Sequence, residues 1–246
     1  MSYDDDSDYN YRAFSFAMDD VGIGRWLREG PKPGQAAPEF SLKTLDGSVV
    51  SLTDLRGQPV VLEFGSYTCP IFCGQIKAME AITHRHPEAA FLVVYTREAH
   101  PGDVTPEHRS PEDKSAAARR LLTEESITRT VLVDDVEGTV HRAYGGAWDA
   151  AYVIDASGTV VLRQAWTHPD EVEQVLTELA AGRPVAARET TDMAPPSDRP
   201  MGEGLLRGGK RALFDFYRTA PPPVQQRLLV SPSAAVRAAL LELTEG

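Results

Sequence analysis

Short apolar runs alternate with helical patterns between residues 34 and 185, and no other feature of the chain constrains its fold as strongly. Residues 60–64 form a nearly continuous apolar run after Pro59, which is typical of a buried strand. Residues 70–83 then place apolar side chains at mostly helical spacing. The alternation continues with expected strands at 91–95 and 130–133 and expected helices at 110–122 and 139–144. It predicts a mixed α/β sheet covered by helices on both faces.

Two hairpins and a last helix complete this pattern, at residues 40–52, 151–164 and 169–181. The turns Asp46-Gly47 and Ser157-Gly158 mark the two hairpins. Alternating strands and helices followed by a hairpin and a helix resemble a thioredoxin-like domain. We therefore predict three parts: an acidic N-terminal extension (1–33), a thioredoxin-like domain (34–185), and a C-terminal extension punctuated by proline and glycine (186–246).

The two extensions show only short helical patterns, and the first lacks a sustained apolar period. We expect one helix at 21–27, and three short helices in the C-terminal extension at 212–217, 224–230 and 234–243. We expect the C-terminal extension to pack on the domain or to stay partly disordered. The alternative is that one of its helices binds a partner protein.

The charge of the whole chain restricts the partners that it can bind. The sequence has 36 acidic and 25 basic side chains, a formal net charge of −11, which disfavours a sequence-independent nucleic-acid binder. No apolar run approaches the roughly 20 residues that span a bilayer. The first residues, MSYDDDSDYN, are acidic where a signal peptide would be basic and then apolar. The sequence therefore predicts a cytoplasmic protein that binds neither nucleic acid nor membranes.

Cys69 and Cys73 are the only cysteines in the chain, too few for a disulfide scaffold. At this spacing in a reducing compartment they indicate redox, catalytic or metal chemistry; the alternative is two buried structural cysteines. Cys69 stands where the strand at 60–64 turns into the helix at 70–83, and the helix dipole favours its thiolate, so we predict that it is the nucleophile. Cys73 follows one turn later on the same face, near enough for a direct disulfide with Cys69. It is therefore one of three things: a resolving thiol, a metal co-ligand or a packing residue.

A histidine follows the next expected strand. The strand at 91–95 runs into a loop that carries His100, and a parallel pairing of the two strands would bring His100 to the same end of the sheet as Cys69. A histidine there can protonate a leaving atom or polarise a substrate oxygen at neutral pH. The alternative is a solvated loop side chain. His108, at the entry of the next helix, is a second candidate.

Three blocks of sequence carry a resemblance to a known family: VLEFGSYTCP at 61–70, FLVVYTREAH at 91–100 and PEHRSPED at 106–113. They resemble the iodothyronine deiodinases, selenoenzymes built on a thioredoxin fold. Cys69 falls at the position of the family's selenocysteine. Shorter matches continue in step, so that the likeness covers residues 36–180.

In that family a selenol takes iodine from an aromatic ring, a histidine assists, and thiols regenerate the enzyme. The resemblance implies that Cys69 is the attacking atom and that His100 and His108 assist. The residues that it implies around the substrate are Ser66, Tyr67, Thr68, Glu98 and Asp149. It also implies a small-molecule substrate, no metal or bound cofactor, and an external thiol or thioredoxin-type protein as the reductant, and it leaves a homodimer open.

The chain departs from the family pattern in three places. A thiolate replaces the selenolate, which should slow attack on iodine. Tyr67 stands where deiodinases have a thiol two residues before the selenocysteine. Arg163 is the only arginine found near the position that clamps the hormone carboxylate. We therefore expect a thiol-dependent oxidoreductase that removes halogen from an aromatic substrate or reduces a related soft electrophile.

Three other functions fit the same cysteines. A peroxiredoxin-like peroxide or disulfide reductase would share the fold and Cys69, with Ser66 at its hydroxyl position but Leu62 in place of an expected proline. The Cys69–Cys73 pair also resembles the C-P-x-x-C motif of Sco copper-delivery proteins, whose two thiolates suit Cu(I). A non-catalytic module that binds partners through residues 186–246 is the third alternative, and it predicts that loss of Cys69 is harmless.

Overall fold

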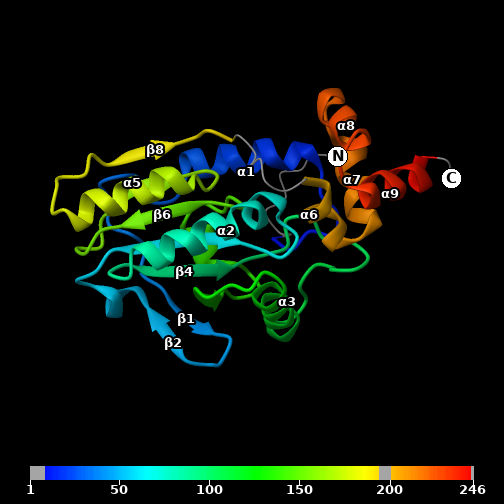
Figure 1. The fold of residues 1–246 in the computed structure, drawn as a ribbon. Helices are drawn as coiled ribbons and strands as arrows, with labels where there is room; N and C mark the ends of the chain where they lie inside the picture. The colour runs from blue at the N-terminus through cyan, green and yellow to red at the C-terminus, as the bar shows by residue number, and fades with distance from the viewer. Residues whose placement is uncertain (1–8, 194–200, 245–246) are drawn as a thin grey trace.

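The computed structural model describes residues 9–193 and 201–244 (Figure 1). Its strands are β1 (Ser41–Thr44), β2 (Val49–Ser51), β3 (Val60–Gly65), β4 (Ala90–Tyr95), β5 (Thr130–Val133), β6 (Ala151–Ile154), β7 (Val160–Gln164) and β8 (Arg188–Thr190). Its helices are α1 (Phe16–Arg28), a short 3-10 helix (Leu52–Leu55), α2 (Pro70–Arg85), α3 (Pro111–Glu124), α4 (Thr139–Ala143), α5 (Pro169–Ala180), α6 (Met201–Gly208), α7 (Lys210–Thr219), α8 (Pro222–Leu229) and α9 (Ala234–Thr244). None of the helices in these two ranges is long and apolar enough to cross a bilayer.

The centre of the sheet has the predicted thioredoxin-like arrangement. The strands lie in the order β2-β1-β5-β4-β3-β6-β7-β8. β3 pairs in parallel with β4, and β4 with β5, so that α2 connects two parallel strands. β6 is antiparallel to both β3 and β7, and α5 follows β7. The hairpin β1–β2 extends the sheet beside β5, and β8, which the sequence did not predict, extends it beside β7.

Apolar side chains alternate across the sheet and build a core on each face. On one face, residues such as Val61 and Val93 pack with side chains of α2, α3 and α5. On the other face, Leu62 and Val94 pack in a cluster that includes Trp26 of α1 and Val140 of α4. The prediction of a mixed sheet with helices on both faces is therefore confirmed.

Local chemistry determines where the helices beside the site begin. Pro70 occupies the first turn of α2, where its missing N–H costs no hydrogen bond. Ser110 caps α3, because its side chain accepts a hydrogen bond from the backbone N–H of Asp113 at 3.1 Å. A Cβ on Gly65 would lie 2.3 Å from the ring of Phe72. Glycine at the end of β3 therefore allows the first turn of α2 to pack directly on the strand.

The N-terminal segment is more ordered than its sequence pattern predicts. α1 begins at Phe16 rather than at residue 21, and the segment before it buries Tyr9, Tyr11 and Phe14. Tyr11 and Phe14 belong to the same apolar cluster as Cys69. The segment therefore packs on the core through single aromatic side chains, although its sequence has no sustained apolar period.

The C-terminal segment packs against one end of the sheet, on the right in Figure 1. Three of its helices, α7, α8 and α9, correspond to predicted ones, whereas α6 was not predicted. α6 contacts α2, and α7 contacts α1. Leu205, Leu213 and Phe216 are buried in the cluster that contains Cys69. Of the two expectations for this segment, packing on the domain is the one observed for residues 201–244.

Candidate active site

The loops that follow β3 and β4 meet at one edge of the sheet and are joined by hydrogen bonds. The backbone N–H of His100 donates to Oγ1 of Thr68 at 3.0 Å. The backbone N–H of Ala99 donates to Oγ of Ser66 at 3.1 Å. The parallel pairing of the two strands is as predicted, and it brings Cys69 and His100 to the wall of one cavity.

The cavity is apolar and has a volume of about 670 Å³. Cys69, His100 and Asp149 lie on its wall. Large aromatic and sulfur-containing side chains from distant parts of the chain make up much of the rest: Phe14, Phe16, Trp148, Trp166, Met193, Met201 and Phe216. Among the described residues of the wall, Arg227 is the only lysine or arginine. The size and lining suit an apolar aromatic molecule with few polar groups.

Cys69 is a buried, protonated thiol. It is 2% exposed, and burial is the main reason why its pKa lies well above the ordinary value, with Asp149 and Cys73 raising it further. Hydrogen bonds from the backbone N–H groups of Phe72 and Ile71, in the first turn of α2, lower the pKa by less. The expectation that the helix N-terminus makes Cys69 a thiolate is therefore wrong, because burial outweighs the helix.

His100 is held as a neutral imidazole between two aromatic rings. Its ring centroid lies 4.3 Å from that of Phe14 and 5.4 Å from that of Phe216. Burial lowers the pKa of His100 to about 3, and the opposing effect of Glu98 is smaller. Nδ1 of His100 has no hydrogen-bond partner among the described residues. At neutral pH this ring can donate at one nitrogen and accept at the other, but it is not a cationic acid.

Asp149 is the third titratable group on the cavity wall. It is fully buried, and burial, together with the nearby Glu63, raises the pKa of its carboxyl group well above the ordinary value. The backbone N–H of Thr167 donates to Oδ2 of Asp149 at 3.1 Å. The wall therefore holds a thiol, a neutral imidazole and a carboxyl group biased toward its protonated form. These three groups on the cavity wall are thus favoured in their uncharged forms.

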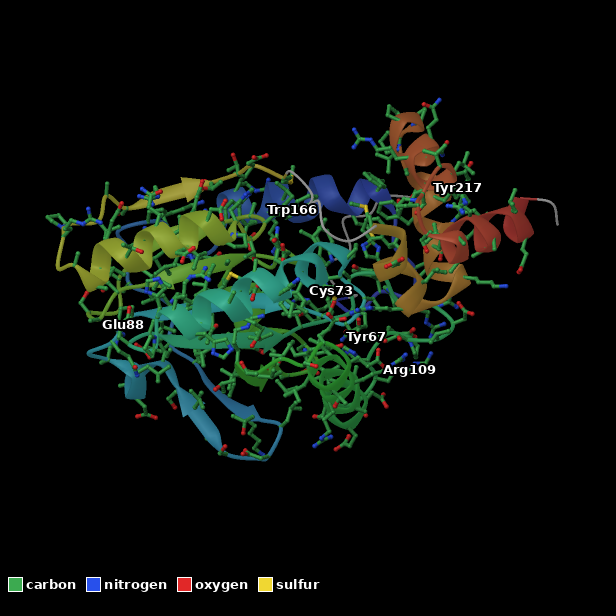
Figure 2. All side chains as sticks on the ribbon, viewed as in Figure 1. Tyr67, Cys73, Glu88, Arg109, Trp166 and Tyr217 are labelled. Carbon is green, nitrogen blue, oxygen red and sulfur yellow. The ribbon has the colours of Figure 1, made fainter. Side chains whose placement is uncertain are left out.

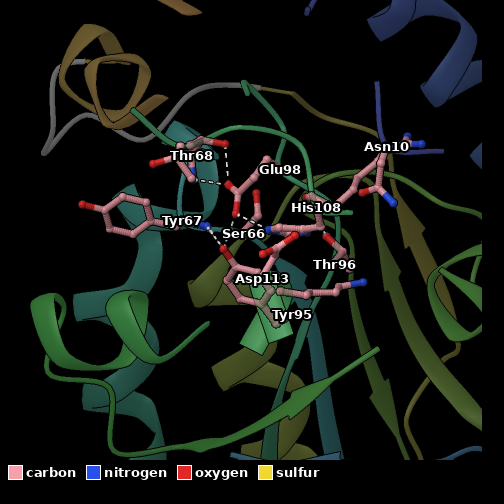
Figure 3. A network of polar contacts seen from close by, with 12 residues as sticks. Asn10, Ser66, Tyr67, Thr68, Tyr95, Thr96, Glu98, His108 and Asp113 are labelled. Carbon is pink, nitrogen blue, oxygen red and sulfur yellow. Dashed lines mark hydrogen bonds and ion pairs between the residues drawn. The ribbon is translucent and has the colours of Figure 1, made fainter. Parts of the chain in front are cut away.

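A buried network centred on Glu98 lies behind the cavity wall (Figure 3). The Glu98 carboxylate accepts hydrogen bonds from the backbone N–H of Thr68 (2.9 Å), the Thr68 hydroxyl (2.6 Å) and the Tyr95 hydroxyl, and it lies 3.1 Å from Nε2 of His108. Burial acts to raise the pKa of Glu98, but the hydrogen bonds of these three neighbours outweigh it and lower the pKa. Glu98 is thus an ionised acceptor that ties the two site loops together.

The predicted site residues divide between the wall and the layer behind it. Asp149 joins Cys69 and His100 on the wall. The others do not line the described cavity and support its loops instead: Ser66, Tyr67, Thr68, Glu98 and His108. Of the predicted site residues, only Cys69, His100 and Asp149 can therefore touch a molecule in the cavity as it is described.

Arg163, the only arginine found near the family's carboxylate-clamping position, does not line the cavity. Its guanidinium stacks on the ring of Trp26 at 3.7 Å and donates to the carbonyl oxygen of Glu29 at 2.7 Å. The side chain is fully buried and also pairs with Glu189. Arg163 therefore joins α1 to the sheet.

Cys73 lies one turn after Cys69 but in different surroundings. Figure 2 labels Cys73 and Tyr67 near the end of α2 that faces α6. Cys73 does not line the cavity; instead Nη1 of Arg207, 134 residues later in the chain, donates to its Sγ at 2.9 Å. Neither cysteine forms a disulfide in the structure. The second thiol thus faces a cation, which a pattern of residues around the cysteines could not predict.

The model of the iodothyronine deiodinase family matches residues 14–179. The chain belongs to this family. The predicted membership is therefore confirmed, and the match begins well before residue 36, so that it includes Phe14 and α1. The family is one of oxidoreductases.

Curated relatives are similar over part of their length. Thyroxine 5-deiodinase of Rattus norvegicus is 34% identical over 114 residues, which cover 42% of this chain and 37% of the relative. Type II iodothyronine deiodinase of Bos taurus is 32% identical over 142 residues, covering 51% of this chain and 52% of the relative. The chain thus matches about a third to a half of the length of these relatives.

Solved structures share the fold. An uncharacterized conserved protein from Geobacillus kaustophilus superposes with a TM-score of 0.53 at 21% identity, covering 64% of this chain and 87% of that chain. A hypothetical protein from Sinorhizobium meliloti superposes with a TM-score of 0.54 at 14% identity, covering 66% of this chain and 91% of that chain. At these identities the likeness concerns the fold alone.

Sequence reasoning missed most of the cavity wall and Arg207. One signal was available for the N-terminal part: residues 9–16 contain four aromatic side chains, a density that indicates burial (Tyr9, Tyr11, Phe14, Phe16). In α6, the spacing of Gly202, Gly204 and Gly208 is a sign of close backbone packing. Nothing local to Arg207 marks it as a partner of Cys73.

The burial of His100 predicts acid sensitivity. Its folded-state pKa of about 3 lies below the unfolded value of about 6.5, so His100 contributes stability that is complete above pH 6.5 and is lost as the pH falls toward 3. Between pH 7 and 4.5, His100→Phe should therefore lose about 2–3 kcal/mol less unfolding free energy than the wild type. Denaturant titrations at the two pH values measure this, and equal losses in both proteins would contradict it.

Proposed function

We propose that this chain is a thiol-dependent reductase that removes halogen, iodine above all, from an apolar aromatic substrate. Cys69 attacks the halogen, His100 handles the proton, and external thiols supply the electrons. The observation that carries the proposal is the cavity, whose aromatic wall encloses a space that reaches one thiol and one neutral histidine. Family membership supports the same class of reaction.

The protonation states of the site suit this reaction, because the thiol proton replaces the halogen. The Cys69 sulfur bonds to the halogen, the carbon–halogen bond breaks, and the ring carbon takes a proton. Since neutral thiol and aryl halide become sulfenyl halide and arene, no net charge develops. A neutral His100 relays the proton by accepting at one nitrogen and donating at the other. External thiols then supply the two electrons that regenerate Cys69; they end as a disulfide, and halide and a proton are released.

The wall supports an aromatic substrate over the alternatives. Aromatic and methionine side chains pack well on rings and on large polarisable atoms. Ser66, which a peroxidase would place beside the reactive sulfur, is not on the wall, and its Oγ accepts the N–H of Ala99. Cu(I) binding is disfavoured because the guanidinium of Arg207 lies 2.9 Å from Sγ of Cys73 and would repel a second cation.

Iodide release from an ortho-diiodinated phenol tests the proposal. Reduced protein with excess dithiothreitol should release iodide continuously and form the mono-iodinated phenol, whereas dithiothreitol alone should not. Hydrogen peroxide consumption is measured in parallel. A protein that consumes peroxide at a steady rate and releases no iodide would replace this proposal with the peroxide reductase.

Gly24 of α1 allows the cavity to be filled without changing the reacting groups. It lines the cavity, and a Cβ there would meet only the flexible Nη1 end of Arg28, at 3.4 Å. Gly24→Trp should raise KM for the phenol by about tenfold or more, because the indole takes up substrate space. Gly24→Ala is the matched control and should keep KM within about twofold. If KM is unchanged in Gly24→Trp, the substrate does not occupy this cavity.

A further inference from the structure

α6 is fitted closely onto the site through its glycines. A Cβ on Gly204 would lie 2.6 Å from Cβ of Pro70, at the start of α2. A Cβ on Gly208 would lie 2.2 Å from the carbonyl oxygen of His100. Both distances are shorter than real Cβ contacts, so only glycine allows the helix to lie this close. The C-terminal segment therefore has a fixed position against the two loops of the site.

This position carries the guanidinium of Arg207 to Cys73. Nη1 donates to Sγ of Cys73 at 2.9 Å and to the carbonyl oxygen of Tyr67 at 3.3 Å, while Nη2 pairs with Glu125. The side chains of Arg207 and Glu125 are only 14% and 10% exposed, so solvent screens them little. The hydroxyl of Thr105 donates to the carbonyl oxygen of Arg207 at 2.7 Å. Hydrogen bonds to the backbone of Arg207 and from its guanidinium thus hold the positive charge beside Sγ of Cys73.

The two thiols have opposite electrostatic surroundings. Cys69 faces an apolar cavity and Asp149, and it is protonated. Burial and the carbonyl oxygens of Ser66 and Tyr67, 3.8 and 3.5 Å from its Sγ, favour the thiol form of Cys73. Against these, Cys73 receives a hydrogen bond from a guanidinium, and a fixed cation beside a buried thiol favours the thiolate. Burial acts to lower the pKa of Arg207, but Cys73 and Glu125 outweigh it and raise that pKa.

We propose that Cys73, held as a thiolate by Arg207, is the resolving thiol of this site, and that turnover passes through a Cys69–Cys73 disulfide. This rests on the proposed function, in which Cys69 becomes a sulfenyl halide. The Cys73 thiolate attacks the Cys69 sulfur, the sulfur–sulfur bond forms, and halide leaves with the electron pair of the sulfur–halogen bond. The charge of the thiolate departs on the halide. An external dithiol then reduces the disulfide with two electrons.

The backbone allows this bond. The N–H of Cys73 donates to the carbonyl oxygen of Cys69 at 3.0 Å, as in one helical turn. Residues four apart in a helix have Cα atoms about 6 Å apart, within the range of disulfides. Cys69 is the N-cap of α2, with extended backbone angles (φ −83°, ψ 107°), rather than an interior helical residue. Its side chain can therefore turn toward Cys73 without breaking the helix.

Oxidation of the reduced protein tests the resolving role without any dehalogenation. One equivalent of hydrogen peroxide oxidises one of the two cysteines to a sulfenic acid, with water as the other product. The second sulfur then attacks it, the sulfur–sulfur bond forms, and hydroxide leaves and takes up a proton. Peptide mass spectrometry should find a Cys69–Cys73 disulfide in the wild type. In Cys73→Ser, Cys69 should persist as a sulfenic acid that dimedone traps. Absence of the disulfide from wild type treated with peroxide and with oxidised dithiothreitol would overturn the proposal.

Arginine variants test the part played by the cation. Arg207→Gln should slow disulfide formation by about tenfold or more, and Arg207→Lys, which keeps a cation, should recover much of the rate. Arg120→Gln is the matched control: Arg120 also stacks on Tyr67, at 4.4 Å, and its Nε donates to Glu124 at 2.8 Å. Equal rates in Arg207→Gln and wild type would show that Arg207 does not activate Cys73.

A single turnover separates this inference from the proposed function. Wild-type protein is mixed with the ortho-diiodinated phenol and no reductant, and both iodide and the disulfide are measured. Iodide without the disulfide would overturn the resolving role and leave the dehalogenase standing. No iodide, with the disulfide still formed by peroxide, would support the resolving role and refute the halogenated substrate.

Discussion

Cys69→Ser is expected to lower the rate of iodide release by at least about a thousandfold. The substitution replaces a polarisable sulfur by a hard oxygen whose proton is far more difficult to remove. Cys69 is the only thiol among the described residues of the cavity wall, and Cys73 faces Arg207 instead. Rates of iodide release at saturating phenol and dithiothreitol, compared between wild type and variant, measure the effect.

Binding must be shown to survive in this variant. Trp148 and Trp166 line the cavity, so quenching of tryptophan fluorescence by the phenol reports occupancy in both proteins. The affinity of Cys69→Ser should stay within about threefold of wild type, because only one atom changes. If the variant binds the phenol and keeps more than about a tenth of the rate, a residue other than Cys69 carries out the reaction. Binding of the phenol without iodide release in either protein would favour the non-catalytic module.

Arg129→Met is expected to lower the unfolding free energy by about 3–5 kcal/mol. The Arg129 side chain is 1% exposed and pairs with Glu63 of β3, which is fully buried, and with Glu80 of α2 at 2.7 Å. Without the cation, the Glu63 carboxylate would be buried at the centre of the sheet with its charge uncompensated. Guanidinium chloride unfolding curves give the difference directly.

Two further variants make this prediction specific. Arg85→Met removes an ion pair with Glu173 whose side chains are 51% and 33% exposed, and it should cost less than about 1 kcal/mol. The double variant Glu63→Gln with Arg129→Met removes both buried charges and should recover much of the loss. A loss below about 1 kcal/mol in Arg129→Met alone would show that the cluster is better solvated than its burial indicates.

The Arg129 cluster also connects the core to the cavity. Glu63 lies on β3, a few residues before Cys69, and its charge helps raise the pKa of Asp149. The same buried carboxylate therefore stabilises the fold through Arg129 and favours the protonated form of a group on the cavity wall.

The central fold was predictable because its signals are local. The apolar run at 60–64, the Pro70 helix start and the Ser110 cap each specify an element through neighbouring residues, and the structure has each of them. β8 and α6 were not predictable in this way. β8 (Arg188–Thr190) carries no apolar run. The helical pattern of α6 is interrupted by glycines, which allow close contact with the backbone of other segments.

The positions of Cys69 and His100 follow from the sequence, because parallel strands bring their following loops to one edge of the sheet. The shape of the cavity does not follow. Phe14 and Phe216 pack on His100 from opposite ends of the chain, and neither lies near a recognisable motif. Side chains so far apart in sequence meet only once the whole chain has folded.

The sequence alone determined the family, the thioredoxin-like sheet and the convergence of Cys69 with His100, since these depend on local patterns and strand order. Only the tertiary structure decided the charges. Burial keeps Cys69 and His100 neutral, against the effect of the helix N-terminus on the thiol, and α6 places Arg207 beside Cys73. A pKa depends on the solvent removed from a group and on the charges around it, and both are set by contacts between residues distant in the chain.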